Sequence, residues 1–462
     1  MAEADAIASN LSDGFAGVSL STVLVEDVWL QIISYLSSYS HSLSQIALVN
    51  RAFSRLVPQY LYRHVVWYPP HTNQLDLKAT GLPKIPSLIH SARLSHNAPH
   101  VKSLTIGGYL SAKPHHARKI VDYALGLVRA FVNIRSLTLS VYAGPESLSD
   151  EVVAEIISSP PNNLFRITIY DSAGSTRLLQ NIECLPTIRA LTLKSPSRAT
   201  LNTLLHVIEL LGPRLEELHL EDNCGSITPG VLRDIEPHIT DLKAFSFGLS
   251  YSITDTFLAD FLEKLPNLET LSLQYYYQGP TGLFPKKGGR LTRLKSFTAY
   301  YGLINEREDA IHLAKWVQRL VRNGPLERLH LVEEDVTEWP LGELAFEGLW
   351  RSLLARHATT LRVLEAPGAM VNTNVVRQVF TKFERLDTIE IGINIGGVKI
   401  LIANGEIPRS LHTVKLWIRH SKHIVPGIEE EVMRSGPGVR LVKLWGGEDV
   451  FEVGFCLGTL TR

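Results

Sequence analysis

Histidine and carboxylate side chains are the groups in this sequence that could carry acid–base or metal chemistry. His115 and His116 stand together between Lys113 and Arg118, in a stretch expected to be a basic loop. A metal ion needs ligands that converge on it from several directions, and two adjacent histidines in a solvated loop do not supply them. We therefore expect a solvated loop here rather than a metal site.

Other titratable residues fall into a repeated pattern. His219 and His330 occupy the same position in two copies of a repeated segment, but three further copies separate them, so a catalytic pair is not expected. Glu333, Glu334 and Asp335 form an acidic run after a predicted strand. Its expected role is a solvated turn, with binding of a basic partner as the second interpretation.

The motifs of common enzyme classes are missing. The sequence has no GxSxG elbow, P-loop, HExxH or CxxC, and the KKGGR loop around Gly288 is a poor phosphate cradle. Cys184, Cys224 and Cys456 are too far apart for a disulfide framework or a zinc site. We therefore expect no enzymatic activity, no cofactor and no metal, in a reducing compartment, that is the cytoplasm, the nucleus or both.

The composition limits the partners. The chain has 462 residues, of which 45% are hydrophobic and 20% charged, enough for a large core. The 46 basic and 46 acidic residues balance, which disfavours nucleic acid or anionic lipid as the main partner. The start of the chain lacks a secretory signal, and no apolar stretch reaches the ~18 residues of a membrane span.

A Leu-x-x-Leu-x-Leu segment recurs along the chain at intervals of 24–35 residues. In a strand, alternate side chains point to opposite faces, so the last two apolar residues of each copy face a core. The copies are VKSLTI at Val101, IRSLTL at Ile134, LFRITI at Leu164, IRALTL at Ile188, LEELHL at Leu215, LKAFSF at Leu242, LETLSL at Leu268, LKSFTA at Leu294, LERLHL at Leu326, LRVLEA at Leu361, LDTIEI at Leu386, LHTVKL at Leu411 and VRLVKL at Val439.

Helix-like segments lie between the copies. Phe257, Phe261, Leu262 and Leu265 form one apolar stripe before Pro266. Strand and helix, repeated and stacked, predict an α/β solenoid with parallel strands on its concave face. A doubly wound sheet is the alternative, but thirteen similar short strands without a GxGxxG argue against it. Residues 101–447 resemble leucine-rich repeats, although the Asn or Cys expected after the strand is clear only at residues 223–224.

The segment before the repeats is helical and short. Apolar residues share one helical face over 25–36, and Ser42 to Gln45 fit a capping box that opens a second helix. Pro58 starts a third turn, and LYRHVVW reads as an extended exit into the first repeat. The apolar stripe of the first helix is Val25, Val28, Trp29, Ile32 and Leu36.

This front segment resembles an F-box over residues 22–64. The resemblance rests on Leu24 and Asp27, on Tyr35–Leu36, on the run ALVNRAF from Ala47 and on the exit LYR from Leu61. The family's Pro after the first Leu is Val25 here, which removes a residue with a preset φ from the first helical turn. The resemblance implies docking on a Skp-family adaptor, and through it a cullin, by Leu24, Val25, Val28, Ile32, Leu36, Leu48, Val49 and Phe53.

A protein substrate is expected on the concave face, at the third, fifth and seventh positions of each copy. The Lys-Leu-Trp repeat predicts two tryptophans on neighbouring strands, and a tyrosine group follows the copies at Leu268 and Leu294. Packing under the C-terminal tail, or in the core after a one-residue slip, is the alternative for these aromatics. The candidate substrate contacts are Trp417, Trp445, Lys415, Lys443, Tyr275, Tyr300, Arg328 and His330.

These expectations combine into one domain plan and one function. A tail over 1–19, an F-box over 20–66, a linker and entry cap over 67–100, repeats over 101–447 and a C-terminal cap or tail over 448–462 are predicted. The resemblance implies a substrate receptor that presents a protein for ubiquitination. A scaffold or inhibitor that binds one protein on its concave face, without an F-box, is the alternative.

Overall fold

The computed structural model describes residues 26–36, 40–68, 87–109, 114–143, 147–170, 173–276, 291–302, 304, 306–334, 344–394, 396–397, 400, 410–411, 413–419, 439–447 and 450–457. It divides into two compact units, Met1–Ile167 with Ser172–Gly174, and Thr168–Asp171 with Ser175–Arg462. No helix within the described residues is long and apolar enough to cross a membrane.

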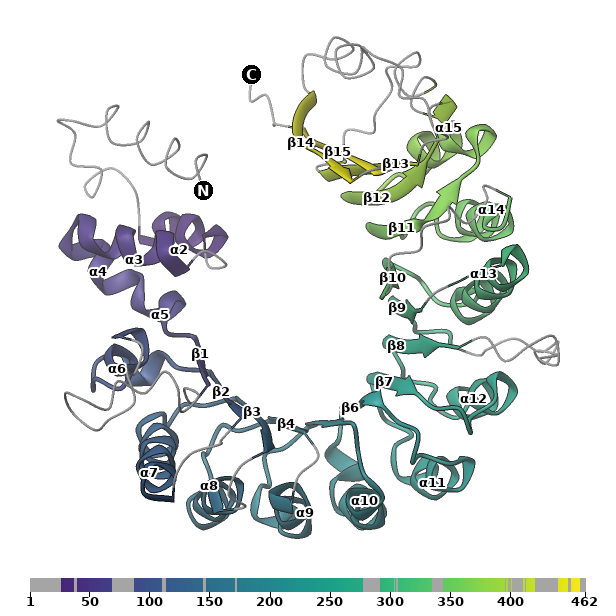
Figure 1. Cartoon of the computed structure of the whole chain (residues 1–462). Coiled ribbons are helices and arrows are strands. Elements are labelled where there is room, and N and C mark those ends of the chain that lie inside the picture. Colours follow the sequence, from purple (N-terminus) through teal and green to yellow (C-terminus); the bar gives the residue numbers. More distant parts are fainter. Residues whose placement is uncertain are drawn as a thin grey trace. The chain divides into compact units, whose positions relative to one another are not determined.

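In the part of the chain that the structure describes, the first unit begins with the short helices α2 to α5 and continues with strand–helix repeats (Figure 1). Strands β1, β2 and β3 pair in parallel in the order of the chain. The LYRHVVW segment, predicted only as an extended exit, supplies β1, because Val65 and Trp67 are buried in register with the first repeat. The elements are α2 (Glu26–Tyr35), α3 (Ser40–Val49), α4 (Arg51–Leu56), α5 (Pro58–Leu61), β1 (His64–Trp67), α6 (Ser87–Ala92), β2 (Ser103–Tyr109), α7 (Pro114–Ala130), β3 (Ser136–Ala143) and α8 (Ser147–Ser158).

Two sequence predictions in this unit are wrong. His115 and His116 lie in the first turn of α7 rather than in a loop, because Pro114 at the first helical position presets the backbone. Ser42 does not cap α3, which already begins at Ser40. Asn50 caps the next helix instead, since its side chain accepts a hydrogen bond of 2.9 Å from the Phe53 N–H.

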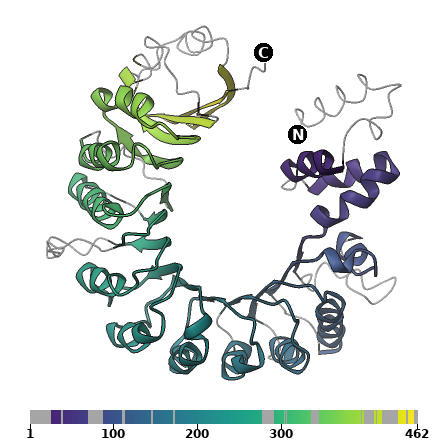
Figure 2. The same cartoon turned by 180° about the vertical axis from the view of Figure 1, so that it is seen from behind.

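The second unit stacks strands on its inner side and helices on its outer side (Figures 1 and 2). Strands β5 to β13 pair in parallel, each with the next in the chain. Its elements, with β4 and α9 at its border, are β4 (Arg166–Tyr170), α9 (Ala173–Gln180), β5 (Ala190–Lys194), α10 (Arg198–Leu211), β6 (Glu217–Asn223), α11 (Pro229–Ile235), β7 (Ala244–Leu249), α12 (Asp255–Leu262), β8 (Thr270–Tyr275), β9 (Ser296–Tyr301), α13 (Arg307–Val321), β10 (Arg328–Glu333), α14 (Glu347–Arg356), β11 (Val363–Val371), α15 (Thr373–Lys382), β12 (Thr388–Ile393), β13 (Thr413–Arg419), β14 (Val439–Gly447) and β15 (Val450–Leu457).

The apolar pattern of the repeats explains this arrangement. In β8, Leu271, Leu273 and Tyr275 are buried and alternate with the more exposed Thr270 and Ser272. The same alternation holds in β4, β6 and β10, so the last two apolar residues of each copy face the core. The predicted α/β repeat fold with parallel strands is therefore confirmed.

The last predicted copy departs from the repeat. Its strand β14 does not pair with β13, because the following strand β15 inserts between the two and pairs antiparallel with both. The Leu-x-Lys-Leu-Trp pattern alone does not show which neighbour a strand will find. The parallel array therefore ends at β13, one copy earlier than predicted.

A charged residue of alternating sign precedes each of the strands β5 to β12. Parallel strands in register bring equivalent positions side by side, so each charge meets an opposite one. Arg189 contacts Glu216 at 3.1 Å, Lys243 contacts Glu216 at 2.7 Å, and Lys295 contacts Glu269 at 2.8 Å. The members of this charge ladder are Arg189, Glu216, Lys243, Glu269, Lys295, Glu327, Arg362 and Asp387.

Candidate functional site

The first candidate surface lies on helices α2 to α5, which form a small core of their own. Four residues, Ile33, Leu43, Leu56 and Val57, are at most 9% exposed. The core closes with an edge-to-face contact between Trp29 and Phe53, whose ring centroids are 4.8 Å apart. The Tyr60 hydroxyl also donates a 3.1 Å hydrogen bond to the backbone oxygen of Leu30.

This core leaves part of the apolar surface uncovered. Leu48 is 80% exposed, Val49 is 68% exposed, and Val28 and Ile32 are 38% and 41% exposed. All four are predicted adaptor contacts. Tyr35, which was not predicted, is also exposed at 74%.

The remaining predicted adaptor contacts have other positions. Leu36 and Phe53 pack against the helical core, and Leu24 and Val25 lie outside the described residues. The difference within α2 follows from helix geometry, since successive residues are rotated by about 100°. Trp29 and Ile33 point to the core. Val28 and Ile32 lie farther round the helix, on a part of its apolar face that the small core does not cover.

The second candidate surface is the strand face of the second unit, where the predicted aromatic residues separate into two groups. Tyr275 is only 7% exposed, and its ring lies 5.2 Å from that of Trp316, so it belongs to the core and not to a substrate surface. Strand alternation places it on the same side as Leu273. Tyr300 lies on the open side and is 38% exposed. Tyr276 directly follows β8, and its ring packs edge-to-face against that of the exposed Tyr251, with the two ring centroids 4.7 Å apart.

The two predicted tryptophans are not on neighbouring strands, because β15 separates β13 from β14. Trp417 and Trp445 are both in register with Glu452 of β15. The Trp417 indole N–H donates a 2.9 Å hydrogen bond to Glu390, and the Lys415 ammonium donates to the other oxygen of the same carboxylate at 3.1 Å. Trp417 and Lys415 are therefore held together by one acid. Lys443 lies in β14 opposite Gly454.

Arg328 and His330 lie in β10 and are not part of a common site with the other predicted substrate contacts. Arg328 is exposed at the start of the strand. His330 is half-buried, and its Nδ1 lies 3.7 Å from a carboxylate oxygen of Glu365 on β11. These two residues face the same side as Tyr300 but lie nearer the amino ends of the strands.

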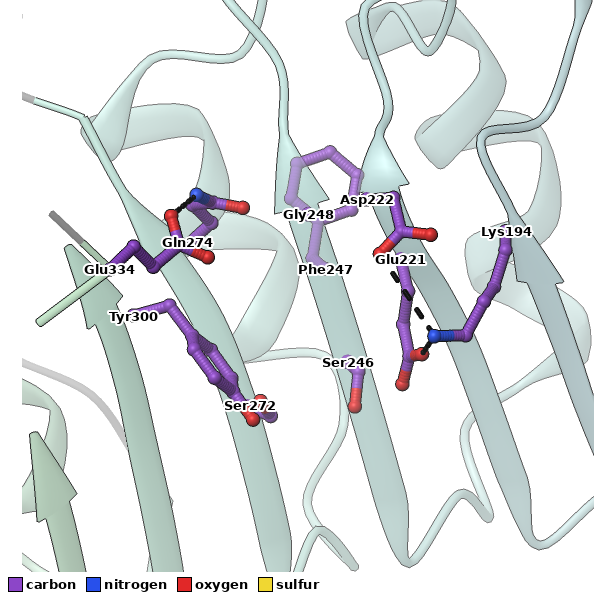
Figure 3. A pocket seen from close by; sticks show the side chains of 10 residues that line it. All are labelled: Lys194, Glu221, Asp222, Ser246, Phe247, Gly248, Ser272, Gln274, Tyr300 and Glu334. Carbon is purple, nitrogen blue, oxygen red and sulfur yellow. Dashed lines mark hydrogen bonds and ion pairs between the residues drawn. The ribbon is translucent and has the colours of Figure 1, made fainter. Parts of the chain in front are cut away.

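The strand face carries a pocket of about 280 Å³ at the carboxyl ends of the strands (Figure 3). Strands β6, β7, β8 and β9 contribute most of its lining, and Glu334 reaches it from the segment after β10. The Glu334 carboxylate accepts a hydrogen bond from the Gln274 side chain of β8. The lining residues are Lys194, Glu221, Asp222, Ser246, Phe247, Gly248, Ser272, Gln274, Tyr300 and Glu334.

Lys194 is the basic residue of this lining. Its ammonium lies 3.2 Å from Glu221, 3.9 Å from Asp222 and 5.3 Å from the centre of the Tyr170 ring. Burial lowers the pKa of Lys194, but the charges of Glu221 and Asp222 outweigh burial and raise it overall. The lysine therefore stays charged and is already engaged by Glu221.

The backbone at the pocket is unusual. Asp222 has φ 60°, in the left-handed region that few residues other than Gly, Asn and Asp adopt. The register of β6 against β7 shifts between Leu220 and Asn223 at the same place. A Cβ on Gly248 would clash with the backbone oxygen of Asp222 and lie 2.8 Å from its nitrogen. The glycine thus allows β7 to approach the turned end of β6.

A chain of hydrogen bonds runs from Glu217 through His219 to Ser246. The imidazole Nδ1 lies 2.7 Å from the Ser246 hydroxyl, and Nε2 lies 3.3 Å from a Glu217 carboxylate oxygen. The arrangement resembles an acid–base–nucleophile series. However, Ser246 stands in a strand paired on both sides, so the backbone N–H groups around it serve the sheet and leave no oxyanion hole.

Sequence reasoning anticipated only part of this pocket. Tyr300 was predicted on the face, and Glu334 was noted in its acidic run. Lys194, Glu221, Gly248, Gln274 and Tyr300 are all seventh positions of successive copies. The seventh position of these five copies therefore supplies half of the ten lining residues.

Comparison with known proteins adds little to these observations. No known protein family matches the sequence, and no curated protein is significantly similar to it. Among solved structures, the chain is similar to one in the crystal structure of the Rad7 and Elc1 complex in yeast. The sequences are 12% identical, the TM-score is 0.40, and the match covers 92% of this chain and 95% of that one.

Proposed function

We propose that this protein is a substrate receptor of a cullin–RING ubiquitin ligase. Helices α2 to α5 dock on a Skp-family adaptor, and the strand face of the repeats holds a protein substrate. The receptor supplies no reacting group. It raises the local concentration of a substrate lysine near the ligase, and this proximity is its contribution to catalysis.

The observation that carries this proposal is the uncovered apolar surface of the helices. A module with its own core still exposes Val28, Ile32, Leu48 and Val49. Exposed apolar groups gain free energy when a partner covers them, at roughly 25 cal/mol per Å². These are also four of the residues through which the F-box resemblance implies adaptor binding.

The test is a pull-down of a purified Skp-family adaptor by the full-length chain. The double variant Leu48→Asp/Val49→Asp places charges on the most exposed part of the surface and should abolish binding. Removal of residues 20–61, which leaves β1 on the first repeat, should do the same. Leu94→Asp is the matched control, since Leu94 is 44% exposed in the same unit but outside helices α2 to α5, and it should bind normally.

Adaptor binding that survives both the double variant and the truncation would contradict the proposal. Absence of binding by the unaltered chain would also contradict it. In that case a scaffold or inhibitor, which binds a protein without recruiting a ligase, becomes the better account of the repeats.

A further inference from the structure

The pocket on the second unit is negative although Lys194 lines it. Three carboxylates, Glu221, Asp222 and Glu334, stand against one ammonium, which leaves two negative charges. Glu221 holds the lysine at 3.2 Å, whereas Asp222 is 3.9 Å away and half its side chain remains exposed. An anionic ligand would meet this excess of like charge, and a cationic one would be attracted.

The serine in the pocket is also arranged to accept hydrogen bonds. A carboxylate can only accept, so the contact between Glu217 and His219 requires a proton on the imidazole Nε2. In the neutral ring, Nδ1 is then an acceptor, and the Ser246 hydroxyl must donate to it across 2.7 Å. The lone pairs of the Ser246 oxygen remain for a donor in the pocket, so the pocket has an acceptor besides its carboxylates.

The acceptors are spread over a width that suits a planar group with several donors. Asp222 and Glu334 lie toward opposite sides of the pocket, and Ser246 lies nearer the amino ends of the strands (Figure 3). Glu334 is hydrogen-bonded to Gln274 on β8, and Asp222 lies near the end of β6, so their supporting strands are two strand spacings apart, roughly 10 Å. A guanidinium group has five N–H donors in one plane and fits such a gap better than a single ammonium.

An aromatic wall completes the arrangement. The Tyr300 ring lines the pocket. The exposed pair Tyr251 and Tyr276 lies outside the lining, in the segments that follow β7 and β8. Arginine stacks on aromatic rings as well as pairing with carboxylates. Tyrosine is also frequent among the residues that dominate the affinity of protein interfaces.

We infer that this pocket binds an arginine side chain of the protein substrate. The inference rests on the proposed function for the nature of the partner, and on the pocket itself for the chemistry. Asp222 and Glu334 pair with the two edges of the guanidinium, Ser246 accepts a hydrogen bond from it, and Tyr300 covers one face.

The test uses the full-length chain and ligand-observed NMR titration, without any adaptor. The probes are a blocked Gly-Ser-Arg-Ser-Gly peptide, the same peptide with citrulline or lysine, and free arginine. Citrulline keeps the shape of arginine and removes its charge. We expect the arginine peptide to bind at least about tenfold more tightly than the citrulline peptide, and more tightly than the lysine peptide or free arginine.

Three pocket variants and two controls locate the site. Asp222→Asn preserves the left-handed backbone, because Asn tolerates that region, and removes only the charge. Asp222→Asn, Glu334→Gln and Ser246→Ala should each weaken the arginine peptide, by about tenfold for the acids. Glu365→Gln and Ser296→Ala change the same residue types on the same strand face outside the pocket, and should leave binding unchanged.

Equal binding of the arginine and citrulline peptides would overturn the inference, as would Asp222→Asn and Glu334→Gln variants that bind like the unaltered chain. Tighter binding of free arginine than of the peptide would overturn the assignment to a protein substrate. None of these outcomes depends on the adaptor. A chain that binds the arginine peptide but no adaptor would instead contradict only the proposed ligase role.

Discussion

The helical module and the repeat array differ in the share of their apolar side chains that is exposed. Helices α2 to α5 have a core of four buried residues and expose large aliphatic side chains. The repeats bury long rows of leucine, isoleucine and phenylalanine and expose polar and charged groups. A small module that leaves apolar surface open gains stability when that surface is covered, whereas the described repeats bury most of their apolar residues within the array.

The largest effect is expected from a cavity in the small core. Ile33→Ala should destabilise the helical module by about 2–4 kcal/mol, because Ile33 is only 1% exposed and few other residues share its core. Hydrogen exchange should accelerate in α2 to α5 and stay unchanged in β5 to β12. Ile32→Ala, at the neighbouring exposed position, should change stability by less than about 0.5 kcal/mol. Uniform acceleration along the chain would refute the idea that the two regions are separately stable.

A somewhat smaller effect is expected at the floor of the pocket. Gly248→Ala should cost about 1–3 kcal/mol, because its Cβ would meet the fixed backbone of Asp222. Urea unfolding measures this cost. Gly230→Ala, whose new Cβ would be 3.5 Å from its nearest neighbour, is the control and should not destabilise the protein. An equal response of the two variants would show that β6 and β7 can move apart at the pocket.

The next effect in size is expected at Asp255, whose charged carboxylate destabilises the folded repeats. Burial raises the pKa of Asp255, at the start of α12, to about 6, although a hydrogen bond from Trp316 opposes the shift. The folded state therefore binds this proton more tightly than the unfolded state, and stability falls as pH rises from about 4 to about 6. A shift of about two pKa units corresponds to about 3 kcal/mol at most, and because Asp255 is only partly buried, Asp255→Asn should stabilise the protein at pH 7 by about 1–2 kcal/mol.

The same comparison at two pH values tests the cause. Thermal unfolding should show the gain of Asp255→Asn above pH 6 and little difference near pH 4, where both side chains are neutral. Asp260→Asn, on the exposed side of the same helix, should have no effect at either pH. A gain of equal size at both pH values would point to packing rather than charge.

The smallest effect is expected in the charge ladder. Lys243→Glu would place an acid between Glu216 and Glu269, and exposed pairs of this kind contribute about 1 kcal/mol or less each. The loss should shrink at high salt, because salt screens exposed charges. Lys315→Glu, on the outer helix α13, is the control. A loss that does not depend on salt would contradict an electrostatic origin.

The ladder also gives a pH dependence of known sign. Hydrogen bonds from Lys243 and Lys295 lower the pKa of Glu216 and Glu269, respectively. A carboxyl group with a lowered pKa in the folded state stabilises it above the unfolded pKa, about 4.3 for Glu, and loses this contribution as pH falls through the folded pKa. Acid below pH 4 should therefore weaken the second unit, and less so in Lys243→Glu.

The sequence was most informative where each repeat carries its own signal. All thirteen copies contain a strand, because the two apolar residues that fix its inner face are local to the copy. Strand pairing is not a local property. The strand of the copy at Val439 pairs with β15 instead of β13, and the residues of that copy alone do not determine this choice. Tyr275 and Tyr300 show the same limit, since one residue of register decides which ring is buried.

The pocket was harder to predict because its parts are far apart in the chain. Glu334 and Gln274 meet although 60 residues separate them, and their contact depends on the side-by-side order of β8, β9 and β10 in the sheet. The left-handed Asp222 lies within a register shift, and the consensus Asn at residue 223 marks only the end of the strand there. In helices α2 and α3, the sequence pattern identified the apolar residues. Which of them are covered depends on the size of the helical core, which covers Leu36 and leaves Leu48 exposed.

The charge ladder limits how this array can have grown. From Arg189 to Asp387 the sign changes with every repeat, so the gain or loss of a single repeat by gene duplication or deletion would bring two like charges together. Gain or loss of two adjacent repeats keeps the order intact. We therefore expect that relatives which differ in length in this region differ by an even number of repeats.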